Sequence, residues 1–153
     1  MIPDVTMRVS LVRHSISVDI LRSARPHLPS CGGYASFEGI VRDLNDGLPV
    51  SRLEYEAYEA LAYAEMERIL QTVATRFGAK FLEVVHRMGV VEVGEVAVFI
   101  QVLAAHRREA FGAAEHIIDE LKRSVPIWKK EHYRDGQTAW TLCQHQGPHT
   151  HDT

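Results

Sequence analysis

The sequence predicts an α+β fold in which a mostly antiparallel sheet is covered by two long helices. Two segments, residues 60–77 and 106–123, place apolar side chains at helical spacing along one stripe. Around them lie short segments rich in β-branched and aromatic residues, which are typical of strands. The 153 residues contain no linker rich in glycine or proline. We therefore expect a single domain over residues 1–143, followed by a flexible tail over residues 144–153.

A strand and a short helix are predicted near the N-terminus. Residues 9–12 are apolar and β-branched enough to form the first strand. Ser17 stands where its hydroxyl can accept a hydrogen bond from the free N–H groups at the start of a helix. We expect Ile20 and Leu21 of this helix to point into the core.

The next two strands are predicted to pair with each other. Residues 34–42 are rich in aromatic and β-branched side chains, and residues 52–58 alternate apolar and charged side chains as a half-buried strand does. Between them, Asn45-Asp46-Gly47 is a strong turn sequence. The two strands are therefore expected to form a hairpin.

Two local signals end the two long helices of the second half. Gly78 follows the stripe of residues 60–77 and is placed to terminate that helix. Pro126 ends the helix over residues 106–123, whose buried stripe includes Phe111, because proline disfavours helix at the residue before it. The remaining predicted strands are residues 81–87 and 96–103, separated by a connection over residues 89–94, and the extended segments 127–133 and 138–142.

Composition and charge exclude several classes of function. The chain has 17 basic and 20 acidic side chains, a net charge of −3 and a pI near 6.3. A protein that coats nucleic acid would normally present a basic face. The two cysteines, Cys31 and Cys143, have no neighbouring cysteine, which favours a reducing compartment. Because no apolar run is long enough to span a membrane and no leader peptide is recognisable, we expect a cytoplasmic protein that binds neither nucleic acid nor membranes.

A run of cations stands at the start of the second long helix. His106-Arg107-Arg108 occupies a position where the helix dipole disfavours each positive charge by about 0.3–1 kcal/mol. Together with the free N–H groups of the helix, these side chains would bind an anion such as a phosphate. The alternative is that Arg107 and Arg108 simply extend into solvent.

Motifs of nucleotide, dinucleotide and zinc-hydrolase sites are absent from the sequence.

Lysines cluster around the end of the same helix. Lys122 lies in its last turn, where cations are favoured in any case. Lys129 and Lys130 are neighbours in an extended segment, so they point to opposite faces and only one can join a given site. We expect the adjacent Trp128 to be buried, which would bring this pair close to the core. A partly desolvated lysine near other cations has a lowered pKa and can act as an acid, a base or a nucleophile.

Two other groups of polar residues have simple structural explanations. Arg42 precedes the turn and can either pair with a neighbouring aspartate or contribute to an anion site. The spacing of His145, His149 and His151 could hold a metal ion, but this tail shows no sign of an ordered element. We therefore assign no metal site and expect no cofactor.

Five stretches in order along the chain resemble the large, catalytic subunit of molybdopterin synthase. Five motifs in register are far more specific than any one of them, and the proline, tryptophan and lysines of the last are the most diagnostic. The resemblance runs from about residue 34 to residue 140. The stretches are FEGIVRD at 37–43, LEYEAY at 53–58, VHRMG at 85–89, AHRREAF at 105–111 and VPIWKKE at 125–131.

The resemblance implies an enzyme of molybdenum cofactor biosynthesis with an α/β hammerhead fold. In that family the large subunit converts cyclic pyranopterin monophosphate to molybdopterin by inserting two sulfurs as a dithiolene, which makes it a sulfurtransferase. The sulfur arrives as a thiocarboxylate on the C-terminal glycine of a small ubiquitin-like subunit. The resemblance also implies a heterotetramer, built on a homodimer of large subunits with a small subunit at each end.

The same resemblance places six cations at the substrate pocket. Lys122 and Lys129 match the two lysines considered catalytic, which would stabilise an oxyanion, protonate a leaving group or form a covalent intermediate. Glu131 would orient Lys129 or Lys130 through a charge-assisted hydrogen bond. Phe37 would shape the apolar wall of the pocket or belong to the core. The six cations are Arg42, His106, Arg107, Lys122, Lys129 and Lys130.

The chain departs from the family pattern at two places, and a second function stays open. Ala104 stands where a small capping residue such as serine is expected, and the sequence after Trp140 does not align with the end of the family. The second hypothesis is a non-catalytic module of the same fold that docks a ubiquitin-like tail or a phosphorylated ligand. Neither Cys31 nor Cys143 has neighbours in the sequence that would activate a persulfide, so the catalytic hypothesis requires a partner that supplies sulfur. The net charge of −3 disfavours an RNA-binding domain.

Overall fold

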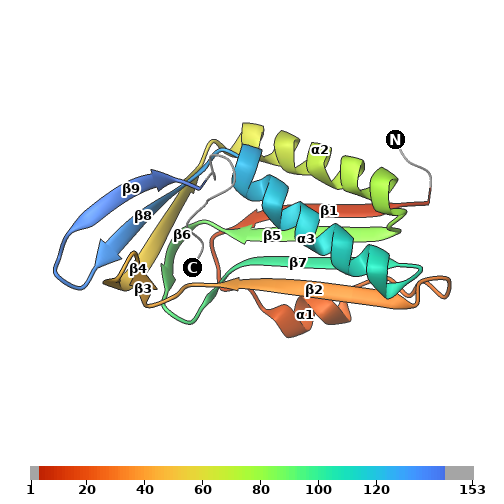
Figure 1. Ribbon diagram of the computed structural model, residues 1–153, viewed down its shortest axis with the longest axis horizontal. Coiled ribbons are helices and arrows are strands. Elements are labelled where there is room, and N and C mark those ends of the chain that lie inside the picture. The colour runs from red at the N-terminus through yellow and green to blue at the C-terminus, as the bar shows by residue number, and fades with distance from the viewer. Residues whose placement is uncertain (1–3, 144–153) are drawn as a thin grey trace.

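The computed structural model describes residues 4–143, and within that range it contains two β-sheets and three helices (Figure 1). The fold class is α+β, as predicted. No helix in this range is both long and apolar enough to cross a membrane. The predicted tail over residues 144–153 lies outside the described residues. The elements are β1 (Thr6–Val12), α1 (Val18–Ser23), β2 (Gly33–Ile40), β3 (Leu44–Asn45), β4 (Leu48–Ala57), α2 (Glu59–Phe77), β5 (Phe81–Arg87), β6 (Gly89–Glu92), β7 (Val96–Ala104), α3 (Arg107–Ser124), β8 (Ile127–Tyr133) and β9 (Thr138–Leu142).

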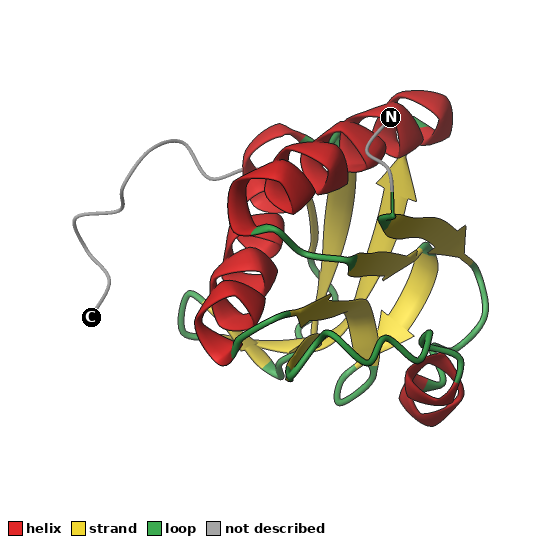
Figure 2. Ribbon diagram, turned by 90° about the vertical axis from the view of Figure 1, so that its right-hand side faces the viewer, coloured by secondary structure: helices red, strands yellow, loops and turns green. Residues whose placement is uncertain are grey.

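The larger layer is a four-stranded sheet in the order β1-β5-β7-β2. The β1 strand runs parallel to β5, and the other two neighbouring pairs of this sheet are antiparallel. Helices α2 and α3 pack side by side on one face, α2 over β1 and β5 and α3 over β7 and β2 (Figure 1). The short α1 lies away from them, on the other side of the sheet (Figure 2).

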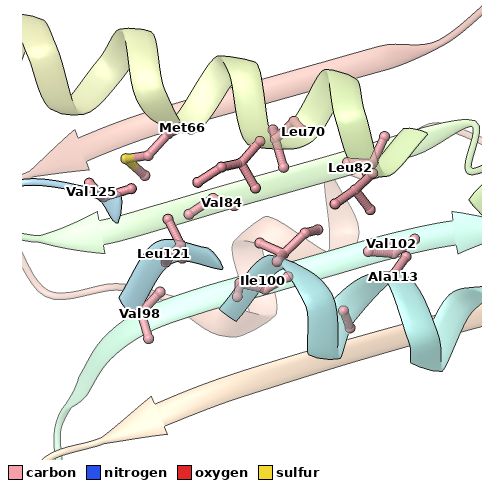
Figure 3. Packing of buried hydrophobic residues seen from close by; sticks show 14 of the residues in the cluster. Met66, Leu70, Leu82, Val84, Val98, Ile100, Val102, Ala113, Leu121 and Val125 are labelled. Atoms are coloured by element: carbon pink, nitrogen blue, oxygen red, sulfur yellow. The ribbon is translucent and has the colours of Figure 1, made fainter. Parts of the chain in front are cut away.

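The hydrophobic core fills the space between these helices and the sheet. Met66 and Leu70 of α2 point toward Leu82 and Val84 of β5, and Leu121 of α3 lies over β7 (Figure 3). Burying a side chain such as Leu70, which is fully inaccessible to solvent, stabilises the fold by roughly 1.5–3 kcal/mol. The core thereby fixes the position of both helices and of the segment that follows α3.

The second sheet continues from the end of the first layer and combines strands from residues 44–57 with strands from the second half of the chain. Its path is β3-β4-β8-β9, and β6 pairs with β4 as well. In Figure 1 this sheet stands at the left, beyond the C-terminal end of α3. Only Val125 and Pro126 separate α3 from β8, and Val125 is extended, so the chain turns directly from the last helical residue into this sheet.

The predicted pairing of residues 34–42 with residues 52–58 is wrong. The β2 strand pairs with β7 in the first sheet, with Phe37 opposite Ile100, whereas β4 pairs with β3, β6 and β8 in the second sheet. The turn sequence does make a hairpin, but a short one in which Asn45 pairs with Leu48. The chain therefore changes sheets just after β2.

Other differences concern exposed apolar side chains and a short strand. Ile20 is 68% exposed and points away from the core, and Ser17 occupies the position before α1 without a side-chain capping bond. Phe111 is 66% exposed, and Ala113 takes its place in the buried stripe of α3. The predicted connection after β5 contains strand β6, which pairs with β4. Gly78 ends α2 in the left-handed conformation, as predicted.

Candidate active site

A cavity of about 820 Å³ lies where the second sheet meets the C-terminal end of α3. Its lining comes from both sheets, from α3 and from the segment between β2 and β4. Phe37 lines this cavity with 40% of its surface exposed, and Val98 and Ile118 add further apolar wall. The cavity thus combines apolar walls with convergent charged and polar side chains, as small-molecule sites do.

Three cations from three different segments of the chain meet in this cavity. Arg42 follows β2, Lys122 belongs to the last turn of α3, and Lys129 lies on β8. Burial lowers the pKa of Lys122, and the positive charges of Lys129 and Arg42 lower it further. Within residues 4–143 no ion pair joins Arg42 or Lys122 to a carboxylate. These two side chains are therefore available to an anionic ligand.

Lys129 faces a buried carboxylate. The Oε1 atom of Glu131 lies 3.5 Å from Lys129 Nζ, and Glu131 is only 4% exposed. The other carboxylate oxygen accepts a hydrogen bond of 2.8 Å from Asn45 Nδ2 and a second from the Tyr133 hydroxyl. Glu131 is thus held by protein groups on both oxygens, which supports the predicted role of orienting Lys129.

Lys130 projects from the face of β8 opposite to Lys129, as the alternation of a strand requires. Its Nζ lies 5.5 Å from the centre of the Trp140 ring, and it does not line the cavity. The expectation that Trp128 is buried is wrong, because it is 46% exposed on the same outer face. The sheet thus separates Lys130 from the two other lysines, and its role in substrate binding stays a prediction.

His106 and Arg107 are placed at the opposite end of α3 from Lys122. With Arg108 they line a separate depression of about 630 Å³. At a rise of 1.5 Å per residue, the helix separates Arg107 from Lys122 by about 22 Å along its axis. A single copy of the chain therefore does not bring the six predicted cations into one pocket. His106 begins the helix without a side-chain capping bond, so the free N–H groups of the first turn remain available.

The cavity also contains residues that the sequence did not single out as functional. His86 is buried beside Tyr55, their ring centres are 5.0 Å apart, and burial lowers the pKa of His86 to about 4. Burial raises the pKa of Cys143 to about 11 although Lys129 and Lys122 are near enough to oppose the shift. The sequence did not reveal that these two lysines lie near Cys143. Even so, the Cys143 thiol stays protonated at neutral pH, because the effect of burial is larger. Tyr133 is two positions after Glu131 on the same strand, so strand alternation alone would have predicted that both side chains lie on the cavity face.

Among residues 4–143, no group of three or more histidine, cysteine, aspartate or glutamate side chains is arranged to hold a metal ion. The three tail histidines His145, His149 and His151 lie outside the described residues.

Comparison with known proteins decides the family. Residues 11–124 match the MoaE protein family. The chain belongs to the MoaE family. It is 43% identical to the molybdopterin synthase catalytic subunit of Pyrococcus abyssi over 131 residues, which are 85% of this chain and 88% of that protein. It is 44% identical to the molybdopterin synthase catalytic subunit of Oryza sativa subsp. indica over 108 residues, which are 71% of this chain and only 56% of the rice protein.

The MoaE fold also appears among solved structures. Molybdopterin synthase from Staphylococcus aureus superposes with a TM-score of 0.78 at 30% sequence identity, covering 92% of this chain and 98% of that chain. The match to the MoaE family includes Arg42, His106, Arg107 and Lys122, but it ends before Lys129. The role of Lys129 stays a prediction from the motif at residues 125–131, and the structure adds that Lys129 shares a cavity with Lys122.

Proposed function

We propose that this protein is the catalytic subunit of a molybdopterin synthase. As a sulfurtransferase it converts cyclic pyranopterin monophosphate to molybdopterin by placing two sulfurs as a dithiolene. Membership of the MoaE family supports this proposal, as does the similarity to a Pyrococcus abyssi catalytic subunit over most of both chains. The chain spans about half the length of the rice relative, and the geometry of the cavity is the further support for this activity.

The meeting of Lys122 and Lys129 in one cavity is the observation that carries the proposal. Both the phosphate of the substrate and a thiocarboxylate are anions. Arg42 and Lys122 line the cavity, and within residues 4–143 neither forms an ion pair with a carboxylate. Because burial and neighbouring cations lower its pKa, Lys122 can exchange a proton more easily near neutral pH than an ordinary lysine. Lys129 would stabilise negative charge that develops on oxygen during sulfur transfer.

We infer that a partner protein supplies the sulfur. Cys143 is the cysteine that lines the cavity, and a thiol with a pKa of about 11 is almost entirely protonated at neutral pH. We therefore propose a small ubiquitin-like partner whose C-terminal thiocarboxylate enters the cavity. Transfer of its sulfur to the substrate, with water supplying the replacing oxygen, leaves an ordinary carboxylate on the partner.

We propose further that two copies of the chain pair in the working enzyme. His106 and Arg107 are about 22 Å from Lys122 along α3, which is too far for one small pterin phosphate to contact both clusters in a single copy. A dimer in which the start of α3 in one copy approaches the cavity of the other would bring five of the six cations together, all but Lys130. This arrangement keeps His106 and Arg107 as substrate-binding residues.

The proposal is tested by reconstitution. The purified protein is mixed with cyclic pyranopterin monophosphate and a small subunit that carries a C-terminal thiocarboxylate, and the dithiolene product is oxidised to a fluorescent pterin. We expect product with the natural protein and loss of product with Lys129→Ala. Lys80→Ala is the matched control because Lys80 is exposed and outside the cavity. Binding of the small subunit without any product would instead indicate a docking module.

A further inference from the structure

Two side chains, those of Asn45 and Tyr133, hold the carboxylate of Glu131 by hydrogen bonds. Asn45 comes from the short β3–β4 hairpin, which is 86 residues away in the sequence, and Tyr133 comes from β8 itself. Asn45 Nδ2 donates to Glu131 Oε2 at 2.8 Å and lies 3.1 Å from the Tyr133 hydroxyl. The hydroxyl donates to the same carboxylate oxygen.

These contacts divide the two oxygens of Glu131 between two tasks. Oε2 accepts from Asn45 and Tyr133, whereas Oε1 faces Lys129 Nζ at 3.5 Å. A carboxylate fixed on one oxygen cannot turn freely about its last side-chain bond, so the direction of its other oxygen is set as well. Glu131 is buried and Lys129 is partly exposed, which makes the carboxylate the fixed partner of the pair.

We propose that Asn45 and Tyr133 are positioning residues for the reaction, which act by fixing Glu131 and, through it, the ammonium group of Lys129 in the cavity. This inference rests on the proposed function for its catalytic part. Asn45 and Tyr133 need not touch the substrate, although both line the cavity. The β3–β4 hairpin thereby has a second role besides reversing the chain, because it carries the side chain that anchors the site.

The isosteric variant Asn45→Asp separates this role from a merely structural one. Aspartate has the same shape and also suits the first position of a turn, but it replaces the donating amide by an oxygen that repels the carboxylate of Glu131. We expect kcat to fall about ten- to a hundredfold, as small displacements of a catalytic group do, while KM for the substrate stays within about twofold. Tyr133→Phe is expected to give a smaller loss, because Asn45 still holds the carboxylate.

Leu48→Ala is the matched control. Leu48 pairs with Asn45 across the hairpin, is 49% exposed and does not line the cavity. It should keep the natural kcat. If Asn45→Asp keeps the kcat of the natural protein, the amide donor does not matter and the inference is overturned. If Leu48→Ala loses as much kcat as Asn45→Asp, the shape of the hairpin is what matters, and the inference is overturned as well.

A second readout does not depend on activity. The hydrogen bond to Glu131 raises the pKa of Tyr133, and the amide of Asn45 opposes that shift. In Asn45→Ala the Tyr133 phenol should therefore ionise at a higher pH than in the natural protein, as followed by NMR of tyrosine labelled at the ring carbon next to the hydroxyl. An unchanged titration would show that Asn45 does not hold this cluster. If the natural protein makes no product in the reconstituted assay, the proposed function and the catalytic part of this inference are both overturned. The Tyr133 titration still tests whether Asn45 holds the cluster, because it does not depend on activity.

Discussion

Acidification is expected to destabilise this protein through His86. The side chain is buried against Tyr55, and its Nδ1 lies 2.9 Å from the carbonyl oxygen of Arg87. Because that oxygen can only accept, Nδ1 carries the proton of a neutral ring. Burial lowers the pKa of His86 from 6.5 to about 4, and the positive charge of Lys122 lowers it as well.

The size and sign of the effect follow from that shift. Below pH 6.5 the unfolded chain binds a proton at His86 that the folded chain does not bind until about pH 4, so the unfolded state gains stability as the pH falls through this window. Each pKa unit corresponds to 1.36 kcal/mol, which makes the full loss of folding free energy about 3 kcal/mol. Well above pH 6.5, where the ring is neutral in both states, the group contributes no pH dependence.

Urea unfolding at a series of pH values measures this loss. The natural protein is compared with His86→Gln, and the quantity compared is the change in unfolding free energy between pH 7 and pH 4 within each protein, so any difference in stability at neutral pH cancels. His14→Gln is the matched control because His14 is exposed. We expect the natural protein and His14→Gln to lose about 3 kcal/mol more than His86→Gln. Equal losses in all three proteins would refute this reasoning.

Three more predictions concern the two cation clusters. Gly33→Ala should lower the unfolding free energy by about 1–3 kcal/mol in thermal or urea melts, because the added Cβ would lie 2.6 Å from the backbone of His106. Lys129→Met should raise the pKa of Lys122 toward its ordinary value and slow its labelling by an amine reagent at neutral pH, as followed by mass spectrometry. If two copies share a site, mixing inactive Lys129→Ala with inactive Arg107→Ala should restore about a quarter of the activity, because one of the two cavities in each mixed dimer is then complete and about half of the dimers are mixed. No restoration would contradict the shared site.

The long helices and the ends of these helices could be predicted from the sequence, because both depend on neighbours within a few turns. The stripe of α2 and its end at Gly78 are as expected, and Pro126 does end α3. The opposite orientation of Lys129 and Lys130 followed from the alternation of a strand. Five local motifs also indicate the family, which the match of residues 11–124 confirms.

Tertiary structure decided which strands pair and which side chains meet. A strand sequence does not encode its partner, so a strong turn after β2 was mistaken for evidence that β2 and β4 pair, although β2 completes the other sheet. Trp128 is exposed because no helix within residues 4–143 packs on the outer face of β8. The anchoring of Glu131 by Asn45 joins residues 86 positions apart, and the length of α3 separates Arg107 from Lys122. The chemistry of each residue is thus local to the sequence, whereas its partners depend on how the two sheets and α3 bury their apolar faces together.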